Sequence, residues 1–237
     1  MNNQTFFEMD KHFFLQPDLS NLTAIKDDPD KIKNELIINE FVNDYKAHTD
    51  VWEPNTTKLV KDIVKQGNQV IDIGASIGYF TLLLSRQVGP TGKVYAIEPT
   101  KHQFPYLLTN IEKNGYADRV EAHNVGAWDK ETMLEFPKVA TNRFYVQAIP
   151  IDRIVKSPID FIKIDTDGSE PQVLRGLRRT IENSPNLKMV IEWYPEYIEK
   201  AGGKPQEVLD FLAKYFTYEA IPEDNAGSCQ NFYCKRK

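Results

Sequence analysis

The ten residues from Val70 to Tyr79 constrain the fold of this 237-residue chain more than any other segment. A short apolar run predicts a buried strand over residues 69–73, and apolar residues at helical spacing predict a helix over residues 79–87. Gly74 and Gly78 bracket the turn between them. A buried strand that turns directly into a helix is the repeating unit of α/β domains.

The same alternation continues towards the end of the chain. Thr100 is expected to cap a helix that carries Phe104 to Ile111, and Pro205 is expected to open the last helix. Another helix is expected from Val173 to Ile181. Further strands are expected over residues 93–97, 119–125, 160–164 and 188–191, with an inserted hairpin over 131–150 and a final pair at 216–221 and 231–234. This order predicts a Rossmann-like α/β fold with a doubly wound, mostly parallel sheet.

The first 50 residues differ in sequence pattern from the rest of the chain, which predicts a helical appendage (1–50) before the main domain (51–237). Asp28 and Pro29 resemble a helix start, and apolar residues at helical spacing predict a helix over residues 29–47. An aromatic cluster precedes it, formed by Phe6, Phe7, Phe13 and Phe14. We expect this cluster to dock onto the main domain, with a lid over the substrate site as the alternative.

Composition sets limits on the partners and the compartment. The chain has 29 basic and 34 acidic residues, a net charge of −5, which argues against a nucleic acid as partner. It shows no signal peptide and no apolar run long enough to span a bilayer, so a cytoplasmic protein is expected. Cys229 and Cys234 are expected to be ordinary thiols.

The glycine turn predicts a site for a cofactor that contains adenosine. Glu98 ends the next predicted strand, where its carboxylate can accept hydrogen bonds from two ribose hydroxyls. Dinucleotide sites prefer three glycines in the pattern G-x-G-x-x-G, but Ser76 stands where the middle glycine would be. Asp72 would repel a pyrophosphate and attract an ammonium group, which favours S-adenosylmethionine (SAM) over NAD. An NAD(P)-dependent oxidoreductase remains the alternative.

Four segments together resemble the FkbM family of SAM-dependent O-methyltransferases. They are Glu53-Pro54, Val70 to Tyr79, Ala96 to Pro99, and Asp160 to Glu170. The resemblance covers roughly residues 51–215, and Asp167 departs from the more usual glutamate. It implies the seven-stranded fold of class I methyltransferases.

The resemblance also implies which residues bind SAM. Asp72 and the turn would line the methionine side, Glu53 would approach the methionine end, and Glu98 would hold the ribose. Residues 124–126 would border the adenine. The complete predicted cofactor set is Glu53, Asp72, Gly74, Ala75, Ser76, Gly78, Tyr79, Glu98, Pro99, Asn124, Val125, Gly126 and Asp165.

Methyl transfer to a hydroxyl needs a base to remove the hydroxyl proton. Asp165, at the end of the fourth strand, is the first candidate, and Glu192, at the end of the fifth, is the second. Lys163 lies two residues before Asp165, so it shares its face of the strand and needs a carboxylate partner if buried. The alternative is that Lys163 reaches water near the strand end. The rings of Trp193 and Tyr194 are expected either to form the floor of an acceptor pocket or to make ordinary packing contacts.

Two further possibilities concern acidic residues near these strand ends. Asp167 and Glu170 are expected to cap the following helix rather than to act in catalysis. Asp165 and Glu192, with Asp167, offer oxygen ligands for a divalent metal, although the sequence lacks a compact ligand cluster and no metal is favoured.

The sequence therefore predicts a SAM-dependent O-methyltransferase that acts on the hydroxyl of a small molecule. The resemblance implies small molecules, natural products and sugars as acceptors, and members sometimes stand beside glycosyltransferase modules. On that analogy a sugar or glycan hydroxyl is expected. A catalytically inactive SAM-binding scaffold is a second alternative.

Overall fold

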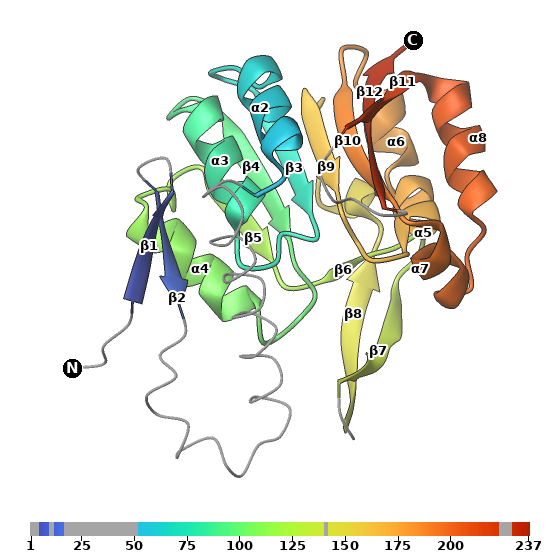
Figure 1. The fold of residues 1–237 in the computed structure, drawn as a ribbon, viewed down its shortest axis with the longest axis horizontal. Helices are drawn as coiled ribbons and strands as arrows, with labels where there is room; N and C mark the ends of the chain where they lie inside the picture. Colours follow the sequence, from blue (N-terminus) through green and yellow to red (C-terminus); the bar gives the residue numbers. More distant parts are fainter. Residues whose placement is uncertain (1–4, 10–11, 17–51, 140–141, 223–228) are drawn as a thin grey trace.

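The computed structural model describes residues 5–9, 12–16, 52–139, 142–222 and 229–237. Its centre is a seven-stranded sheet with the strand order β11-β12-β10-β9-β3-β4-β5 (Figure 1). In chain order the strands are β3 (Gln69–Ile73), β4 (Lys93–Ile97), β5 (Val120–His123), β9 (Phe161–Ile164), β10 (Lys188–Trp193), β11 (Phe216–Ile221) and β12 (Gln230–Arg236).

The order in which the strands are connected reverses between β3 and β9, and this reversal creates a crevice in the middle of the sheet. The inner strands pair in parallel, and only the final β11–β12 pair and the β12–β10 pair are antiparallel. The chain leaves β3 towards β4 on one side and returns later as β9 on the other. Ligands of open α/β sheets bind outside the carboxyl ends of the strands at such a reversal. The predicted site lies there.

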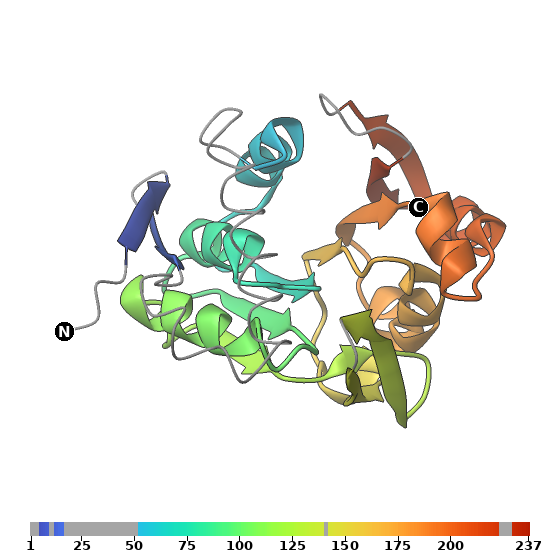
Figure 2. The same cartoon turned by 60° about the horizontal axis from the view of Figure 1, so that its bottom comes forward.

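Helices cover both faces of the sheet (Figures 1 and 2). The helices α2 (Pro54–Ile63), α3 (Tyr79–Val88) and α4 (Phe104–Lys113) pack on the face that carries Val70. The helices α5 (Glu170–Gly176), α6 (Arg178–Glu182) and α8 (Pro205–Tyr215) pack on the opposite face, which carries Ile71. Because side chains alternate along a strand, Asp72 and Lys163 belong to the first face, beneath α2 and α3.

The structure confirms most of the predicted elements and changes some of their bounds. The third predicted strand is shorter, because β5 ends at His123 and Gly126–Ala127 (β6) joins a second sheet. In that sheet β6 pairs with β8 (Asn142–Ile149), which forms the expected hairpin with β7 (Thr132–Val139). Two helices that begin with proline were not among the predicted elements, α2 and the shorter α7 (Pro195–Lys200).

The contacts of Thr100 confirm its predicted capping role, although α4 itself begins at Phe104. The Thr100 hydroxyl accepts from the Gln103 amide at 3.4 Å, and the Thr100 carbonyl accepts from the Phe104 amide at 3.0 Å. Gln103, directly before α4, makes no capping bond with its side chain. The Thr100 hydroxyl also donates to Oε1 of Glu98 at 2.6 Å. Thr100 therefore belongs to the candidate site described below.

Little of the predicted appendage lies within the described residues. Residues 5–9 and 12–16 form an antiparallel hairpin, β1 (Thr5–Met9) and β2 (His12–Gln16), in which Phe7 pairs with Phe14. The helix predicted over residues 29–47 and the boundary at residue 50 lie outside the described residues. In the part of the chain that is described, no helix is long and apolar enough to cross a membrane.

Candidate active site

A pocket opens where β3 and β9 end, beneath the start of α3. Trp52, Ile77 and Phe80 supply part of its wall. The other lining residues are ones that the sequence had predicted: Asp72, Gly74, Ala75, Ser76, Tyr79, Lys163 and Asp165. The structure thus brings together the methionine side of the predicted cofactor site and the first candidate base.

The turn after β3 depends on Gly74. This glycine has φ +84°, and a Cβ added to it would lie 1.7 Å from the carbonyl oxygen of Asp165. Its backbone therefore passes directly against the chain that follows β9. From the sequence, Gly74 was expected to let the backbone approach a ligand closely. The contact with Asp165 already requires a glycine at this position. The same contact fixes the distance between the turn and the candidate base.

Three residues other than glycine have a positive φ in the described chain, and all three surround this region. They are Glu53 (φ 43°), Ser76 (φ 51°) and Asp167 (φ 51°). Backbone in this conformation is unfavourable for residues with a side chain and tends to gather at functional sites.

Asp72 is buried at the base of the pocket, with 2% of its surface exposed. Its Oδ2 accepts a hydrogen bond from the Thr81 hydroxyl at 2.5 Å. Burial raises the pKa of Asp72 to about 6, and the Thr81 bond and the charge of Lys163 oppose that rise. A cationic ligand would favour the ionised form of this carboxylate.

Glu98 links the glycine turn to the loop after β4. Its Oε2 accepts from the Ser76 backbone amide at 2.8 Å, and its Oε1 accepts from the Thr100 amide at 2.7 Å. Burial raises the pKa of Glu98 above its usual value. A carboxylate has about four acceptor positions, so the three bonds from Ser76 and Thr100 leave room for a ribose hydroxyl.

The remaining predicted cofactor residues lie at the edge of this arrangement. Asn124 donates to the backbone oxygens of Glu98 and Pro99, which places it beside the predicted ribose carboxylate. Gly126 is a buried strand residue of β6, and Val125 packs against the core on the α5 side. Gly78 begins α3 with φ 106° and lies close to Leu107 of α4. The roles predicted for these residues in cofactor binding stay predictions.

The predicted pairing of Lys163 with a carboxylate is confirmed. Lys163 is 1% exposed, and its Nζ donates to Oδ2 of Asp165 at 2.7 Å. The same ammonium lies 4.4 Å from the centre of the Phe80 ring. Burial would lower the pKa of Lys163, but Asp165 and then Glu53 raise it well above its usual value. Lys163 is therefore a permanent positive charge, and it does not reach water as the alternative supposed.

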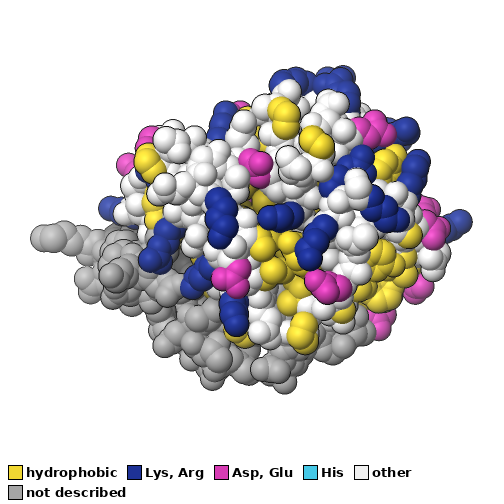
Figure 3. Space-filling model, turned by 90° about the horizontal axis from the view of Figure 1, so that it is seen from above, with side chains coloured by type: hydrophobic (Ala, Val, Ile, Leu, Met, Phe, Trp, Pro, Cys, Tyr) yellow, Lys and Arg dark blue, Asp and Glu magenta, His cyan; other side chains and the backbone are white. Residues whose placement is uncertain are grey.

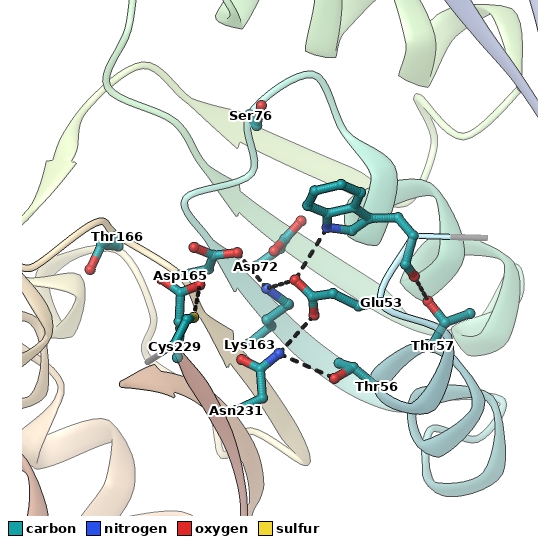
Figure 4. A network of polar contacts seen from close by, with 12 residues as sticks. Glu53, Thr56, Thr57, Asp72, Ser76, Lys163, Asp165, Thr166, Cys229 and Asn231 are labelled. Carbon is teal, nitrogen blue, oxygen red and sulfur yellow. Dashed lines mark hydrogen bonds and ion pairs between the residues drawn. The ribbon is translucent and has the colours of Figure 1, made fainter. Parts of the chain in front are cut away.

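Glu53 connects three parts of the site (Figure 4). Its Oε1 accepts from Nε1 of Trp52 at 3.2 Å and lies 3.9 Å from Nζ of Lys163. Its Oε2 accepts from Nδ2 of Asn231, on β12, at 3.0 Å. Asn231 could not be selected from the sequence, because no local motif marks a residue that the fold brings in from the last strand.

Glu192, the second candidate base, lies beside Asp165 in an acidic cluster. Burial, and then the charge of Asp165, raise the pKa of Glu192 to about 9. Its Oε1 accepts a hydrogen bond from the thiol of Cys229 at 2.9 Å. Oxygens of Asp165, Asp167 and Glu192 all lie within 4.8 Å of one another. These three carboxylates are the possible ligands of a divalent metal that were named from the sequence. Their spacing would allow them to bind one metal ion.

Neither of the two acids proposed as helix caps takes that role. Glu170 is the buried first residue of α5, and its Oε1 accepts from the backbone amides of Thr166 and Gly168, so it organises the loop before the helix. The residue that precedes α5 is Ser169, so Asp167 does not cap this helix. Asp167 belongs instead to the acidic cluster.

Trp193 does not form the floor of an acceptor pocket. It follows Glu192 on β10, so its side chain points to the opposite face, where it packs with Phe232 and donates to the Pro205 carbonyl. Tyr194 instead stacks on Tyr197, with ring centres 4.2 Å apart. Tyr197 is 37% exposed, and its backbone lies against Gly168 next to the acidic cluster.

The residues present fit SAM. The turn is open to a ligand along Gly74 to Ser76, and Asp72 and Asp165 offer carboxylates to a cation. The rings of Trp52 and Tyr79 supply an apolar wall, which suits the methionine chain. Among the described residues that line the pocket, no side chain offers an anion site for a pyrophosphate, since Lys163 is paired with Asp165.

The seven-stranded sheet, with a pocket where the strand order reverses, is the fold of the class I SAM-dependent methyltransferases. The sequence comparisons give the family. The chain belongs to the FkbM methyltransferases, because the profile described as Methyltransferase FkbM domain matches residues 72–220. The profile of the protein-L-isoaspartate(D-aspartate) O-methyltransferases (PCMT) also matches, over residues 4–133. The match to methyltransferases gives no support to the oxidoreductase alternative.

Two curated relatives are both named protein-L-isoaspartate O-methyltransferase. The protein from Aeropyrum pernix is 44% identical over 55 residues, which are 23% of this chain and 21% of that protein. The protein from Methanococcoides burtonii is 22% identical over 117 residues, which are 48% of this chain and 58% of that protein. The chain therefore spans less than two thirds of either relative.

Solved methyltransferases share the fold. The FkbM methyltransferase from Methylobacillus flagellatus KT has a TM-score of 0.56 at 18% identity, covering 91% of this chain and 59% of that one. The O-methyltransferase from Bacillus cereus, in complex with S-adenosylhomocysteine (SAH), has a TM-score of 0.56 at 20% identity and covers 92% and 95%. TomG from Streptomyces achromogenes, in complex with SAM, has a TM-score of 0.51 at 16% identity and covers 76% of both chains.

Proposed function

We propose that this protein is an O-methyltransferase that moves the methyl group of SAM to an uncharged hydroxyl, with Asp165 as the base. The observation that carries the proposal is the position of Asp165. It lines the pocket of the glycine turn and is 30% exposed, and Lys163 holds its Oδ2 at 2.7 Å. Among the described residues no hydrogen bond to its Oδ1 is present, so that oxygen is available to a substrate proton.

SAM supplies an activated methyl group, so the protein has to position the acceptor and remove its proton. Asp165 accepts the hydroxyl proton while the oxygen forms its bond to the methyl carbon. Lys163 is a positioning residue, because its ammonium fixes the carboxylate of Asp165 through one oxygen. Phe80 and Glu53 in turn fix the ammonium.

Glu192 has a different role from the one the sequence suggested. With its pKa raised to about 9, Glu192 carries a proton at neutral pH. A protonated carboxyl group can donate a hydrogen bond to the acceptor but cannot take a proton from it. We assign Glu192 to holding the acceptor oxygen, with Asp165 as the base.

The acceptor is an uncharged compound, and a sugar hydroxyl is our choice within that class. Asp165 and Asp167 converge beside the pocket, so an acceptor with a negative charge at the reacting atom would be repelled. Tyr197 is exposed, stacks on the half-buried Tyr194, and has its backbone against Gly168 next to these acids, so its side chain is our candidate for contact with a sugar ring.

Methylation of a protein carboxyl group is the second candidate. It is favoured by the PCMT profile over residues 4–133 and by the names of the curated relatives. The reacting group of that substrate is a carboxylate, and the convergence of Asp165 and Asp167 opposes it.

Transfer of labelled methyl from SAM to two sets of acceptors separates the candidates. Neutral glycosides form one set, and peptides that contain an isoaspartyl residue form the other. We expect transfer to the glycosides, with a label that survives mild alkali because it is an ether. Transfer to the peptides, with a label that alkali releases as an ester would, contradicts the proposal.

A further inference from the structure

The pocket combines carboxylates with aromatic rings. Trp52, Tyr79 and Phe80 line it together with Asp72 and Asp165. Negative groups and ring faces both attract positive charge. One ring already does so, since the Lys163 ammonium lies 4.4 Å from the centre of the Phe80 ring.

Trp52 is held in place by this network before any ligand arrives. Its indole Nε1 donates to Oε1 of Glu53 at 3.2 Å, and its backbone oxygen accepts from the Thr57 hydroxyl at 2.7 Å. Glu53 adopts φ 43°, a conformation that costs free energy, and Asn231 binds its other oxygen. A side chain fixed in this way loses little freedom when a ligand binds against it.

We infer that Trp52 is a specificity-determining residue that recognises the positive charge of the SAM sulfonium, so that the protein binds SAM more tightly than SAH. The inference rests on the proposed function. A ring face favours a cation over a neutral group of the same shape, and indole is the strongest of the natural rings in this respect. Tyr79, whose hydroxyl is within 3.0 Å of the Thr57 hydroxyl, stands on the same side of the pocket.

The charge of the ligand changes during the reaction. The acceptor oxygen forms a bond to the methyl carbon, the carbon–sulfur bond breaks with its electron pair on sulfur, and the hydroxyl proton passes to Asp165. The sulfonium becomes a neutral thioether. The attraction of the Trp52 ring is then lost, which helps SAH to leave and the next SAM to enter.

Calorimetric titration with SAM and, separately, with SAH tests this inference without the need for an acceptor. Trp52→Leu removes the ring, and Trp52→Phe keeps a weaker one. Removing apolar contact weakens both ligands, so the informative quantity is the ratio of the two affinities. Tyr145→Leu is the matched control, because Tyr145 is 50% exposed on the β7–β8 hairpin and does not line the pocket.

We expect the preference of the intact protein for SAM over SAH to fall about fivefold in Trp52→Leu and by less in Trp52→Phe. Tyr145→Leu should keep the original ratio. An unchanged ratio in Trp52→Leu, with SAM and SAH both still bound, overturns the role of Trp52 and leaves the proposed function standing. Failure of the intact protein to bind either ligand overturns the proposed function itself.

Discussion

Burial of the Asp72 carboxylate, which can bind a cationic ligand, lowers the stability of the folded protein. A carboxylate whose pKa rises from 3.8 to about 6 on folding destabilises the folded protein once the pH exceeds its unfolded value, because the folded state must then give up a tightly held proton. The cost grows between pH 3.8 and about 6 and is fully present at neutral pH. A cationic ligand recovers part of that cost when it binds.

Asp72→Asn should therefore stabilise the free protein at pH 7.5 by about 1–3 kcal/mol while it weakens SAM binding. Thermal unfolding and calorimetry measure the two effects on the same sample. In the unchanged protein, SAM affinity should fall as the pH drops below about 6, and the variant should lack that dependence. A variant that is less stable and binds SAM as before would show that Asp72 is a purely structural residue.

Asp165→Asn tests the base. The amide keeps the shape of the side chain and still accepts from Lys163, but it cannot take a proton. We expect kcat to fall by about 10²–10⁴ with little change in SAM affinity. The comparison requires calorimetry beside the rate assay, because loss of SAM binding with the fold intact would make Asp165 a cofactor ligand instead.

Glu192→Gln tests the proton on the second acid. Because Glu192 stays protonated up to about pH 9, kcat/KM should decline as the pH rises above that value. The glutamine variant keeps a hydrogen-bond donor and should retain activity at pH 7.5 within about tenfold, without the decline at high pH. A large loss at pH 7.5 together with an unchanged alkaline decline would speak for Glu192 as the base.

Individual site residues could be predicted where a local motif marks them. Asp72, Gly74 and Glu98 follow from the strand, turn and strand pattern, and Lys163 was recognised because a lysine in an apolar strand needs a partner. Asn231 and Cys229 could not be found in this way. They come from the last strand and the residue before it, and only the position of β12 beside β10 brings them to the site.

The elements around the pocket are held at a fixed separation by backbone contact. Gly74 at the end of β3 touches the backbone of Asp165 after β9, and this contact joins the cofactor turn to the catalytic strand. The strands themselves could be predicted from their apolar runs. The sequence left Trp193 open between an acceptor pocket and ordinary packing. Because β10 extends two residues past its predicted end, Trp193 points to the other face and packs there.

Two alanine variants separate the strain of a positive φ from the effect of that contact. Gly74 and Gly115 have similar φ values, +84° and +71°, but a Cβ at Gly115 would meet nothing within 4 Å. Gly115→Ala should cost about 1 kcal/mol of stability. Gly74→Ala should cost more and should also abolish SAM binding, because the turn must move away from Asp165. Equal costs in chemical denaturation, with SAM binding intact in both variants, would contradict this account.

At the scale of the whole molecule, both faces of the sheet are covered by apolar core, and the functional groups gather on one of them, towards the carboxyl ends of the strands. The carboxyl ends of β3, β9 and β10 carry the charged residues, the start of β12 adds Asn231, and α2 and α3 close over them (Figure 4). The opposite side of the molecule, seen from above in Figure 3, carries scattered lysine and arginine side chains among apolar ones. The fold class was predictable because the alternation of strands and helices runs through most of the chain, whereas α2 and the shorter α7 carry few apolar residues and do not stand out.

The most direct test of the account is a calorimetric titration of the intact protein with SAM and, separately, with NAD, each with and without magnesium. We predict binding of SAM with micromolar affinity, no binding of NAD, and no effect of magnesium on either result. A SAM affinity that depends on magnesium would turn Asp165, Asp167 and Glu192 into metal ligands. Absence of SAM binding under all of these conditions would contradict the central claim, and the turn from Gly74 to Gly78 would then serve only to pack β3 against β9 and α4.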